Sequence, residues 1–479
     1  MLFRSVQGLV SDHKDFAPRV GLAYAPGSAK KGPQKTVIRG GIGMFYDRIG
    51  FGPFESAFLN NGINQFDYTV TNPTFYPNVP SPSSLNAGTN EIYKVDPKLR
   101  ADYSIQSAIG VERQLPHSTT VAVTYTNNRS NHLAQTIPIN TPYPGTYNYL
   151  LAPGPANGVF PYGYSAGNIL EYESGGLLKQ NILMVNFNTR FSRNVSLQGN
   201  YQYTHANDLP STPTNPYNFL QDWGTSNLNR RSNFTVIGSI TGPAKIVIAP
   251  TIVARSGGPY DVTVNQDIYG DNGTARALFA PAGSPCGVGG VVCTPLGNFS
   301  TNYNVPGTST SILNGAAIPA SLVPRNYLTM AGLVSVNMRI YRVFGLGAKK
   351  NAADAAAPPP GGGGGRGAGG GGFGGPGGGG GRGGGGMRMG GGGGGRGGGM
   401  GGSSDRRYSV TIGANFTNML NHLNPGGYEG VLTSNQFGQP TSVNTGFGGG
   451  GAGGGGGAFG GGGSNANNRR IDLSVRFNF

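Results

Sequence analysis

Apolar and polar residues alternate along much of the chain. Across Tyr103–Val111 most odd positions are apolar, and the positions between them are mostly small or polar. A turn at Leu115–Ser118 follows, and the alternation resumes across Val121–Tyr125. A period of two residues places successive side chains on opposite faces of an extended strand. These runs therefore predict a β-hairpin.

The same alternation recurs along the rest of the chain and predicts about eleven or twelve strands. A second hairpin is expected from Leu183–Phe191 and Val195–Tyr203. The other alternating runs are Val20–Tyr24, Val37–Tyr46, Phe234–Ile240, Ile246–Arg255, Val334–Ile340, Tyr408–Phe416 and Ile471–Phe479. Very short turns alternate with long segments rich in Asn, Pro and Gly, which is typical of a membrane barrel with short periplasmic turns and long external loops.

These features together predict an all-β fold, a transmembrane antiparallel β-barrel. A soluble β-sandwich also alternates, but it does not confine long loops to every other connection. Aromatic residues at strand ends, such as Phe45–Tyr46, Tyr201 and Tyr203, suit the lipid headgroup level, although packing in a soluble sheet would also explain them. No apolar run reaches the length of about 18 residues that a membrane helix needs, and the best candidate, Ile246–Ala254, contains Pro250.

The composition suits a barrel wall better than a soluble domain. Only 11% of the 479 residues are charged and 37% are hydrophobic, whereas soluble domains carry about 25% charged residues. The net charge of +15 also permits a nucleic-acid interpretation. Much of the arginine, however, lies in glycine tracts or beside strand ends, which favours solvated loops. We expect no nucleic acid as a partner.

Two glycine-rich tracts, 353–403 and 447–465, cannot bury enough apolar surface to fold and are expected to be disordered loops, placed in external connections. They divide the chain into barrel strands and loops over 1–352, a strand and loop over 404–446, and a C-terminal strand over 466–479. The arginines of the first tract resemble RGG segments that contact RNA, but such segments usually interleave aromatic residues, and only Phe373 is present.

No pattern of catalytic residues is found, so we expect no enzyme activity, no cofactor and no metal. The histidines are scattered, and glycine motifs in the tracts follow no strand that leads into a helix. Asp267, Asp271, Asn272 and Gly273 form an oxygen-rich loop, in which an Asn-Gly turn is favoured over a calcium site. The two cysteines, Cys286 and Cys293, suit a disulfide in an oxidising compartment, and a free pair remains the alternative.

The last strand ends on an aromatic residue. Ile471, Leu473, Val475, Phe477 and Phe479 share one face, and polar residues occupy the other. This pattern resembles the C-terminal signal by which the barrel assembly machinery recognises outer-membrane proteins. A terminal strand with this pattern by chance is the alternative. A free edge of this kind would promote aggregation in a soluble sheet, whereas closure of a barrel removes it.

Several ordered motifs resemble the barrel of TonB-dependent receptors, specifically the Oar-like group. They are Phe16–Tyr24, Val37–Tyr46, Tyr103–Leu115, Asn229–Phe234, Ser256–Tyr260, Asn415–Asn421 and Arg470–Phe479. The resemblance implies a 22-stranded barrel closed by an N-terminal plug, with a periplasmic box that contacts TonB. About half of those strands are found here, and no signal peptide is visible near Met1. The chain is therefore expected to be the C-terminal part of the barrel, within a longer protein.

The resemblance implies energy-coupled uptake of an unidentified ligand across the outer membrane of a Gram-negative bacterium. The expected partners are outer-membrane lipid and lipopolysaccharide, the barrel assembly machinery, that ligand, and TonB through the missing N-terminal part. Two other functions stay open. One is a surface adhesin whose external loops contact other cells or polymers without transport. The other is a basic, glycine-rich RNA-binding protein.

Overall fold

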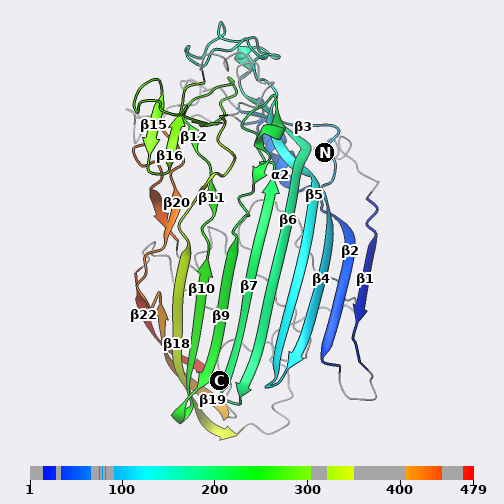
Figure 1. Ribbon diagram of the computed structural model, residues 1–479, viewed down its shortest axis with the longest axis vertical. Coiled ribbons are helices and arrows are strands. Elements are labelled where there is room, and N and C mark those ends of the chain that lie inside the picture. The colour runs from blue at the N-terminus through cyan, green and yellow to red at the C-terminus, as the bar shows by residue number, and fades with distance from the viewer. Residues whose placement is uncertain are drawn as a thin grey trace.

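One curved antiparallel sheet runs through the structure (Figure 1). The computed structural model describes residues 15–27, 34–65, 91–303, 321–349, 406–444 and 468–478, with positions 75, 78 and 81. Long strands follow one another around the sheet in chain order, each hydrogen-bonded to the next. They are β1 (Arg19–Tyr24), β2 (Thr36–Tyr46), β4 (Tyr103–Leu115), β5 (Thr119–Pro138), β6 (Ile169–Ser192), β7 (Val195–Asp208), β9 (Ser232–Thr241), β10 (Ile246–Arg255), β18 (Leu333–Lys349), β19 (Arg406–Thr417) and β22 (Arg470–Asn478). The predicted all-β antiparallel barrel wall is confirmed.

The register places apolar residues of neighbouring strands on one shared face. Ile252 of β10 lies opposite Val236 of β9 and Val336 of β18. Farther along, Leu473 and Val475 of β22 are 84% and 74% exposed, although both are apolar. Exposed apolar rows on one face, with polar rows on the other, are the pattern of a wall between lipid and a polar interior. We therefore assign the apolar face as the outer face.

Two strands are longer than the alternation predicted. β5 extends to Pro138, and β6 begins at Ile169, well before the predicted run at Leu183. The extra residues carry no simple period of two, because β-bulges interrupt the pairing near Leu133. Gly176 is required here, since a Cβ atom would lie 2.7 Å from the Leu133 Cβ. These extensions lead from the predicted strands to the long connections above the wall.

Short elements, which the alternation does not reveal, surround the loop end of the wall. They are the helix α2 (Phe51–Leu59), the 3-10 helices η3 (Tyr164–Ala166), η4 (Phe219–Asp222) and η5 (Pro243–Lys245, at the opposite end), and the strands β3 (Ile92–Val95), β8 (Gly224–Thr225), β11 (Pro259–Tyr260), β12 (Thr263–Val264), β13 (Ala275–Arg276), β14 (Leu278–Phe279), β15 (Val291–Thr294), β16 (Gly297–Ser300), β17 (Leu328–Thr329), β20 (Pro425–Tyr428) and β21 (Pro440–Val443). β3 pairs in parallel with β6. No helix among the described residues has the length and apolar character needed to cross a membrane.

The connections divide between the two ends of the wall. Tight turns join β4 to β5, β6 to β7 and β9 to β10 at the lower end in Figure 1, and long connections lie at the upper end. The prediction that long connections occur at every other position is wrong at one place. β18 descends and β19 ascends, with Lys349 opposite Arg406, so the connection that contains the tract 353–403 leaves and re-enters the wall at the turn end. Both glycine-rich tracts, 353–403 and 447–465, lie outside the described residues, and their expected disorder stays a prediction.

β1 and β22 form the two edges of the sheet in the part of the chain that the structure describes. Every residue of β1 is exposed, and most residues of β22 are exposed as well. A strand at an edge has one row of backbone N–H and C=O groups without a ladder partner, and hydrocarbon offers those groups no hydrogen bond. Both edges are therefore surfaces that a membrane would require to be covered.

We expect the outward-facing amides of β1 and β22 to exchange hydrogen much faster than those of β7, which has neighbours on both sides. The measurement is hydrogen–deuterium exchange on the monomeric chain in detergent. β7 is the internal control, because β6 and β9 both pair with it. Protection of β1 and β22 equal to that of β7 would contradict the open edges.

Candidate functional site

The described parts of four long connections pack together above the wall, and we call them the cap: residues 139–168, 209–231, 256–332 and 418–444. Their centre is a cluster of buried apolar side chains that includes Val262, Val264, Phe299 and Tyr303. Leu432, from the last of these connections, is buried in the same cluster. Backbone hydrogen bonds from Thr263 to Gly430 and from Leu432 to Thr263 join the two segments. The cap is thus a packed unit and not a set of separate loops.

A buried ion pair crosses the cap. Arg276 Nη2 lies 2.9 Å from Asp222 Oδ1, and both side chains are almost completely buried. The same carboxylate accepts hydrogen bonds from the backbone N–H and hydroxyl of Thr214. Arg276 also donates to the carbonyl oxygens of Val323 and Gln221. A charge removed from water needs such partners, so this pair fixes how three stretches of the cap meet.

A second ion pair attaches the cap to the wall. Arg325 donates through Nη1 to the carboxylate and to the carbonyl oxygen of Asp208, the last residue of β7. Ser226 donates to the same carboxylate, and Asn326 donates to the carbonyl of Thr225. These contacts hold the segment before β18 against the end of β7.

The oxygen-rich loop is a self-capped turn. Asp267 accepts backbone hydrogen bonds from Gly270, Asp271 and Asn272, and Asp271 accepts one from Gly273. Its carboxylates are therefore used as acceptors for N–H groups, which corresponds to the turn favoured over a calcium site. Burial, and then the charge of Asp267, raise the pKa of Asp271 to about 7. Asn272 has a φ of 58°, a conformation that asparagine tolerates well.

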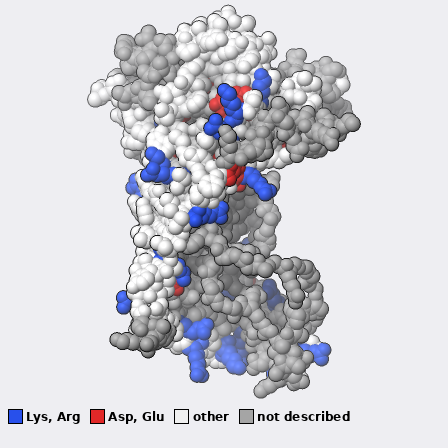
Figure 2. All heavy atoms as spheres, turned by 90° about the vertical axis from the view of Figure 1, so that its right-hand side faces the viewer, with Lys and Arg blue, Asp and Glu red and all other residues white. Residues whose placement is uncertain are grey.

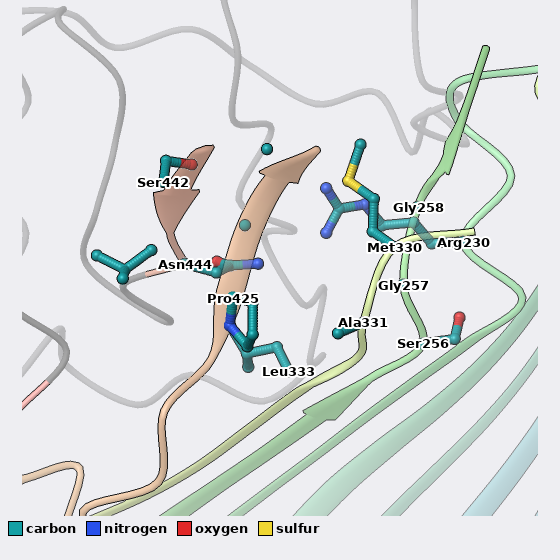
Figure 3. Close-up of a pocket in the computed structure, with 13 residues that line it drawn as sticks. Arg230, Ser256, Gly257, Gly258, Met330, Ala331, Leu333, Pro425, Ser442 and Asn444 are labelled. Carbon is teal, nitrogen blue, oxygen red and sulfur yellow. The ribbon is translucent and has the colours of Figure 1, made fainter. Parts of the chain in front are cut away.

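A cavity of about 290 Å³ lies where the cap meets the wall (Figure 3). Residues 256–258 with Met330, Ala331 and Leu333 border it on one side, and the β20–β21 hairpin borders it on the other. The guanidinium of Arg230 lies beside Met330, across the cavity from Ser442 and Asn444. Gly257 must be glycine, because a Cβ atom would lie 1.7 Å from the Met330 carbonyl oxygen. The cavity therefore offers one cation, several polar groups and an apolar floor.

The inner face of the wall continues below this cavity with polar side chains. Arg255, at the end of β10, donates through Nε to Asn233 Oδ1 at 3.1 Å and lies close enough to Arg230 for their charges to repel. Lower down, Asn200 donates to Asn186 at 3.1 Å between β7 and β6. A polar ligand that left the cavity would meet hydrogen-bonding groups along this face. The alternation predicted this polar face, but not the cavity.

The cavity is lined in part by two of the motifs quoted from the sequence, Asn229–Phe234 and Ser256–Tyr260, but not by the cysteine pair or by the C-terminal strand. Cys286 and Cys293 form a disulfide, with the Cα atoms 5.5 Å apart, at an exposed corner of the cap. Ile471, Leu473, Val475 and Phe477 lie on the outer face of β22, opposite apolar residues of β19. Phe479 lies outside the described residues. The role of these residues as an assembly signal stays a prediction. Sequence reasoning missed Arg230 as a binding candidate, since a single arginine in a loop carries no pattern.

A family model described as "Outer membrane beta barrel domain" matches residues 4–353 of the chain. The chain belongs to this family. It is therefore an outer-membrane protein, as predicted. No curated protein matches the sequence significantly. The Oar-like assignment is neither supported nor opposed by the family match, and it stays a prediction.

Solved outer-membrane structures are similar to the chain at very low identity. The outer membrane transporter YddB from Escherichia coli has 9% identity and a TM-score of 0.38, over 81% of this chain and 35% of that one. A mutant of the ferric enterobactin receptor PfeA from Pseudomonas aeruginosa has 8% identity and a TM-score of 0.39, over 86% of this chain and 35% of that one. The siderophore receptor PiuA from Acinetobacter baumannii has 6% identity and a TM-score of 0.36, over 85% of this chain and 32% of that one. The chain spans about a third of the length of these proteins.

We expect Arg276→Met to destabilise the cap by about 3–5 kcal/mol, because Asp222 would stay buried without its cation. Trp223, the only tryptophan in the chain, follows Asp222, so its fluorescence during urea unfolding reports on the cap. Arg470→Met is the matched control, since the Arg470–Asp472 pair is exposed and worth at most about 1 kcal/mol. A loss below about 1 kcal/mol for Arg276→Met would contradict the structural role of the buried pair.

The raised pKa of Asp271 predicts that cap stability depends on pH. The folded state holds this proton up to about pH 7, whereas an unfolded carboxyl loses it near pH 4. The stabilising contribution is therefore complete below about pH 4 and is lost as the pH rises through 7. Trp223 fluorescence in urea, measured at several pH values, should show this loss in the native chain. Asp271→Asn should flatten the profile between pH 4 and 7, and an unchanged profile would contradict the assignment to Asp271.

Proposed function

We propose that this chain forms part of the wall and the external cap of a TonB-dependent receptor, which takes up a polar ligand across the outer membrane. One observation carries the proposal: a cavity lined by Arg230 and several polar residues lies between cap and wall, and its lining residue Ser256 directly follows Arg255, a polar residue of the inner face. The sequence motifs that resemble TonB-dependent receptors give independent support. TonB would act through a part of the receptor outside this chain.

The packed cap favours uptake over adhesion. The Asp222–Arg276 pair joins segments within the cap, and the Asp208–Arg325 pair attaches the cap to the end of β7, so the residues between these pairs are held in a fixed arrangement. An adhesin needs an exposed contact surface, but it does not need a preorganised cavity above a polar channel wall. Adhesion remains the second candidate. It predicts that deletion of the gene abolishes cell attachment and leaves growth on every limiting nutrient unchanged.

The proposal predicts that Arg230→Ala weakens uptake. A charge-assisted hydrogen bond contributes about 1.5–3 kcal/mol, so its loss should raise the nutrient concentration needed for half-maximal growth by at least tenfold, as a rough estimate. The measurement is growth of a strain that carries the variant in the complete gene, supplied with one limiting nutrient at a time: ferric chelates, cobalamin, oligosaccharides or peptides. The nutrient is identified as the one whose use requires both this gene and TonB.

Arg231→Ala is the matched control, because it removes the same charge one residue away and does not line the cavity. Its growth should equal that of the native strain. No TonB-linked nutrient phenotype on deletion of the gene would reject the proposal. Loss of attachment to cells or polymers in that deletion strain would then favour the adhesin, and salt-dependent RNA binding by the purified chain would favour the third candidate.

A further inference from the structure

Basic side chains gather at the turn end of the wall. Figure 2 views the right-hand side of Figure 1, and at the lower end of that view several Lys and Arg side chains are visible with no Asp or Glu side chain among them. The described strand ends and turns at this end are residues 24–27, 34–38, 111–121, 188–198, 239–248, 341–349, 406–412 and 474–478, and Glu112 is their only acidic residue. We call the following exposed cations the basic belt: Arg113, Arg193, Lys245, Arg342, Arg406 and Arg407.

Two members of the basic belt lie within the outer, lipid-facing rows. Arg342 of β18 lies opposite Ile246 of β10 and Ile412 of β19, which are 40% and 50% exposed. Arg113 of β4 lies opposite Val121 of β5. An arginine in such a row keeps its stem along the apolar surface and extends its guanidinium to the nearest polar layer. These guanidinium groups therefore mark the headgroup level.

Aromatic residues accompany the cations at this end of the wall. The guanidinium of Arg342 lies 4.6 Å from the centre of the Phe344 ring, and that of Arg407 lies 5.8 Å from the centre of the Tyr408 ring. Tyr408 in turn stacks on Phe477 of β22. Exposed aromatic rings are enriched where hydrocarbon meets headgroups. Cations and aromatic rings therefore occur together along the turn end of the wall, as expected where a barrel meets an anionic headgroup layer.

The charge on the inner face is arranged differently. Arg39, which lies on that face of β2, pairs with Glu112 at 3.4 Å. The acidic residue of this end is thus placed towards the interior, and the lipid side carries positive charge alone. A surface with one sign of charge attracts ligands of the opposite sign over about a Debye length.

We propose that the basic belt binds the phosphate groups of anionic phospholipids in the periplasmic leaflet of the outer membrane. Tight turns mark the periplasmic end of an outer-membrane barrel, and that leaflet consists of phospholipids. Arg113 and Arg342 lie in rows that only lipid can reach in the membrane, which favours a headgroup over a soluble anion or the cell wall. The proposal rests on the outer-membrane location and is independent of ligand uptake.

The test compares spin-labelled phosphatidylglycerol with spin-labelled phosphatidylcholine around the full chain, extracted from outer membranes and reconstituted in phosphatidylcholine bilayers. At low salt, the native chain should restrict the motion of phosphatidylglycerol about fivefold more than that of phosphatidylcholine. One lysine or arginine near an anionic membrane surface raises the affinity by about that factor. The preference should approach unity in roughly 0.5 M salt. Equal restriction of the two lipids at low salt would overturn the proposal without any variant.

The double variant R113Q R342Q should reduce the preference at least twofold. R190Q is the matched control, because Arg190 is also exposed at the turn end but lies opposite Ser196 in an inward-facing polar row. It should leave the preference unchanged. An undiminished preference in the double variant would overturn the assignment to the belt. So would release of phosphatidylglycerol by millimolar glycerol phosphate, because the belt would then be a site for free phosphate esters.

Discussion

Backbone hydrogen bonding in hydrocarbon is the constraint on which the whole structure depends. Each N–H and C=O group of a spanning strand must find a partner in the next strand, because lipid provides none. The unbroken pairing from β1 to β22 satisfies this requirement at every internal strand. It also explains why Gly413 lies against β18, where a Cβ atom would be 2.9 Å from the carbonyl oxygen of Ile340. Among the strands that the structure describes, the two at the edges leave the requirement open.

The same constraint moves the close-packed core out of the wall. Lipid covers the outer face, so apolar side chains such as Leu473 stay exposed in the protein itself. The buried apolar cluster lies in the cap instead, around Phe299 and Tyr303. Tyr303 donates its hydroxyl to the carbonyl of Arg276, which joins that cluster to the buried ion pair. Apolar packing and the Asp222–Arg276 pair therefore stabilise the cap together, while the strand ladder stabilises the wall.

The sequence predicts the wall well, because lipid on one side and polar groups on the other impose a period of two. The prediction from the sequence fails where the chain no longer has one apolar and one polar face. The upper part of β6 before Leu183 lacks the period, because β-bulges shift the pairing of this part with β5. The short cap strands, such as β12 and β13, are ordered by contacts distant in sequence. Arg230 could not be selected for the same reason, since its position at a cavity depends on segments that lie 100 and 200 residues further along the chain.

Charge placement follows from the same division between lipid and water. Asp222 and Arg276 are buried as a pair because each neutralises the other away from water. Arg342 is tolerated in an apolar row only because its long stem reaches a polar layer beyond the strand end. A lysine or arginine at that height lowers its free energy further when the layer is anionic. In the cap a carboxylate offsets the cost of removing Arg276 from water, and at the turn end of the wall an anionic headgroup would do the same for Arg342.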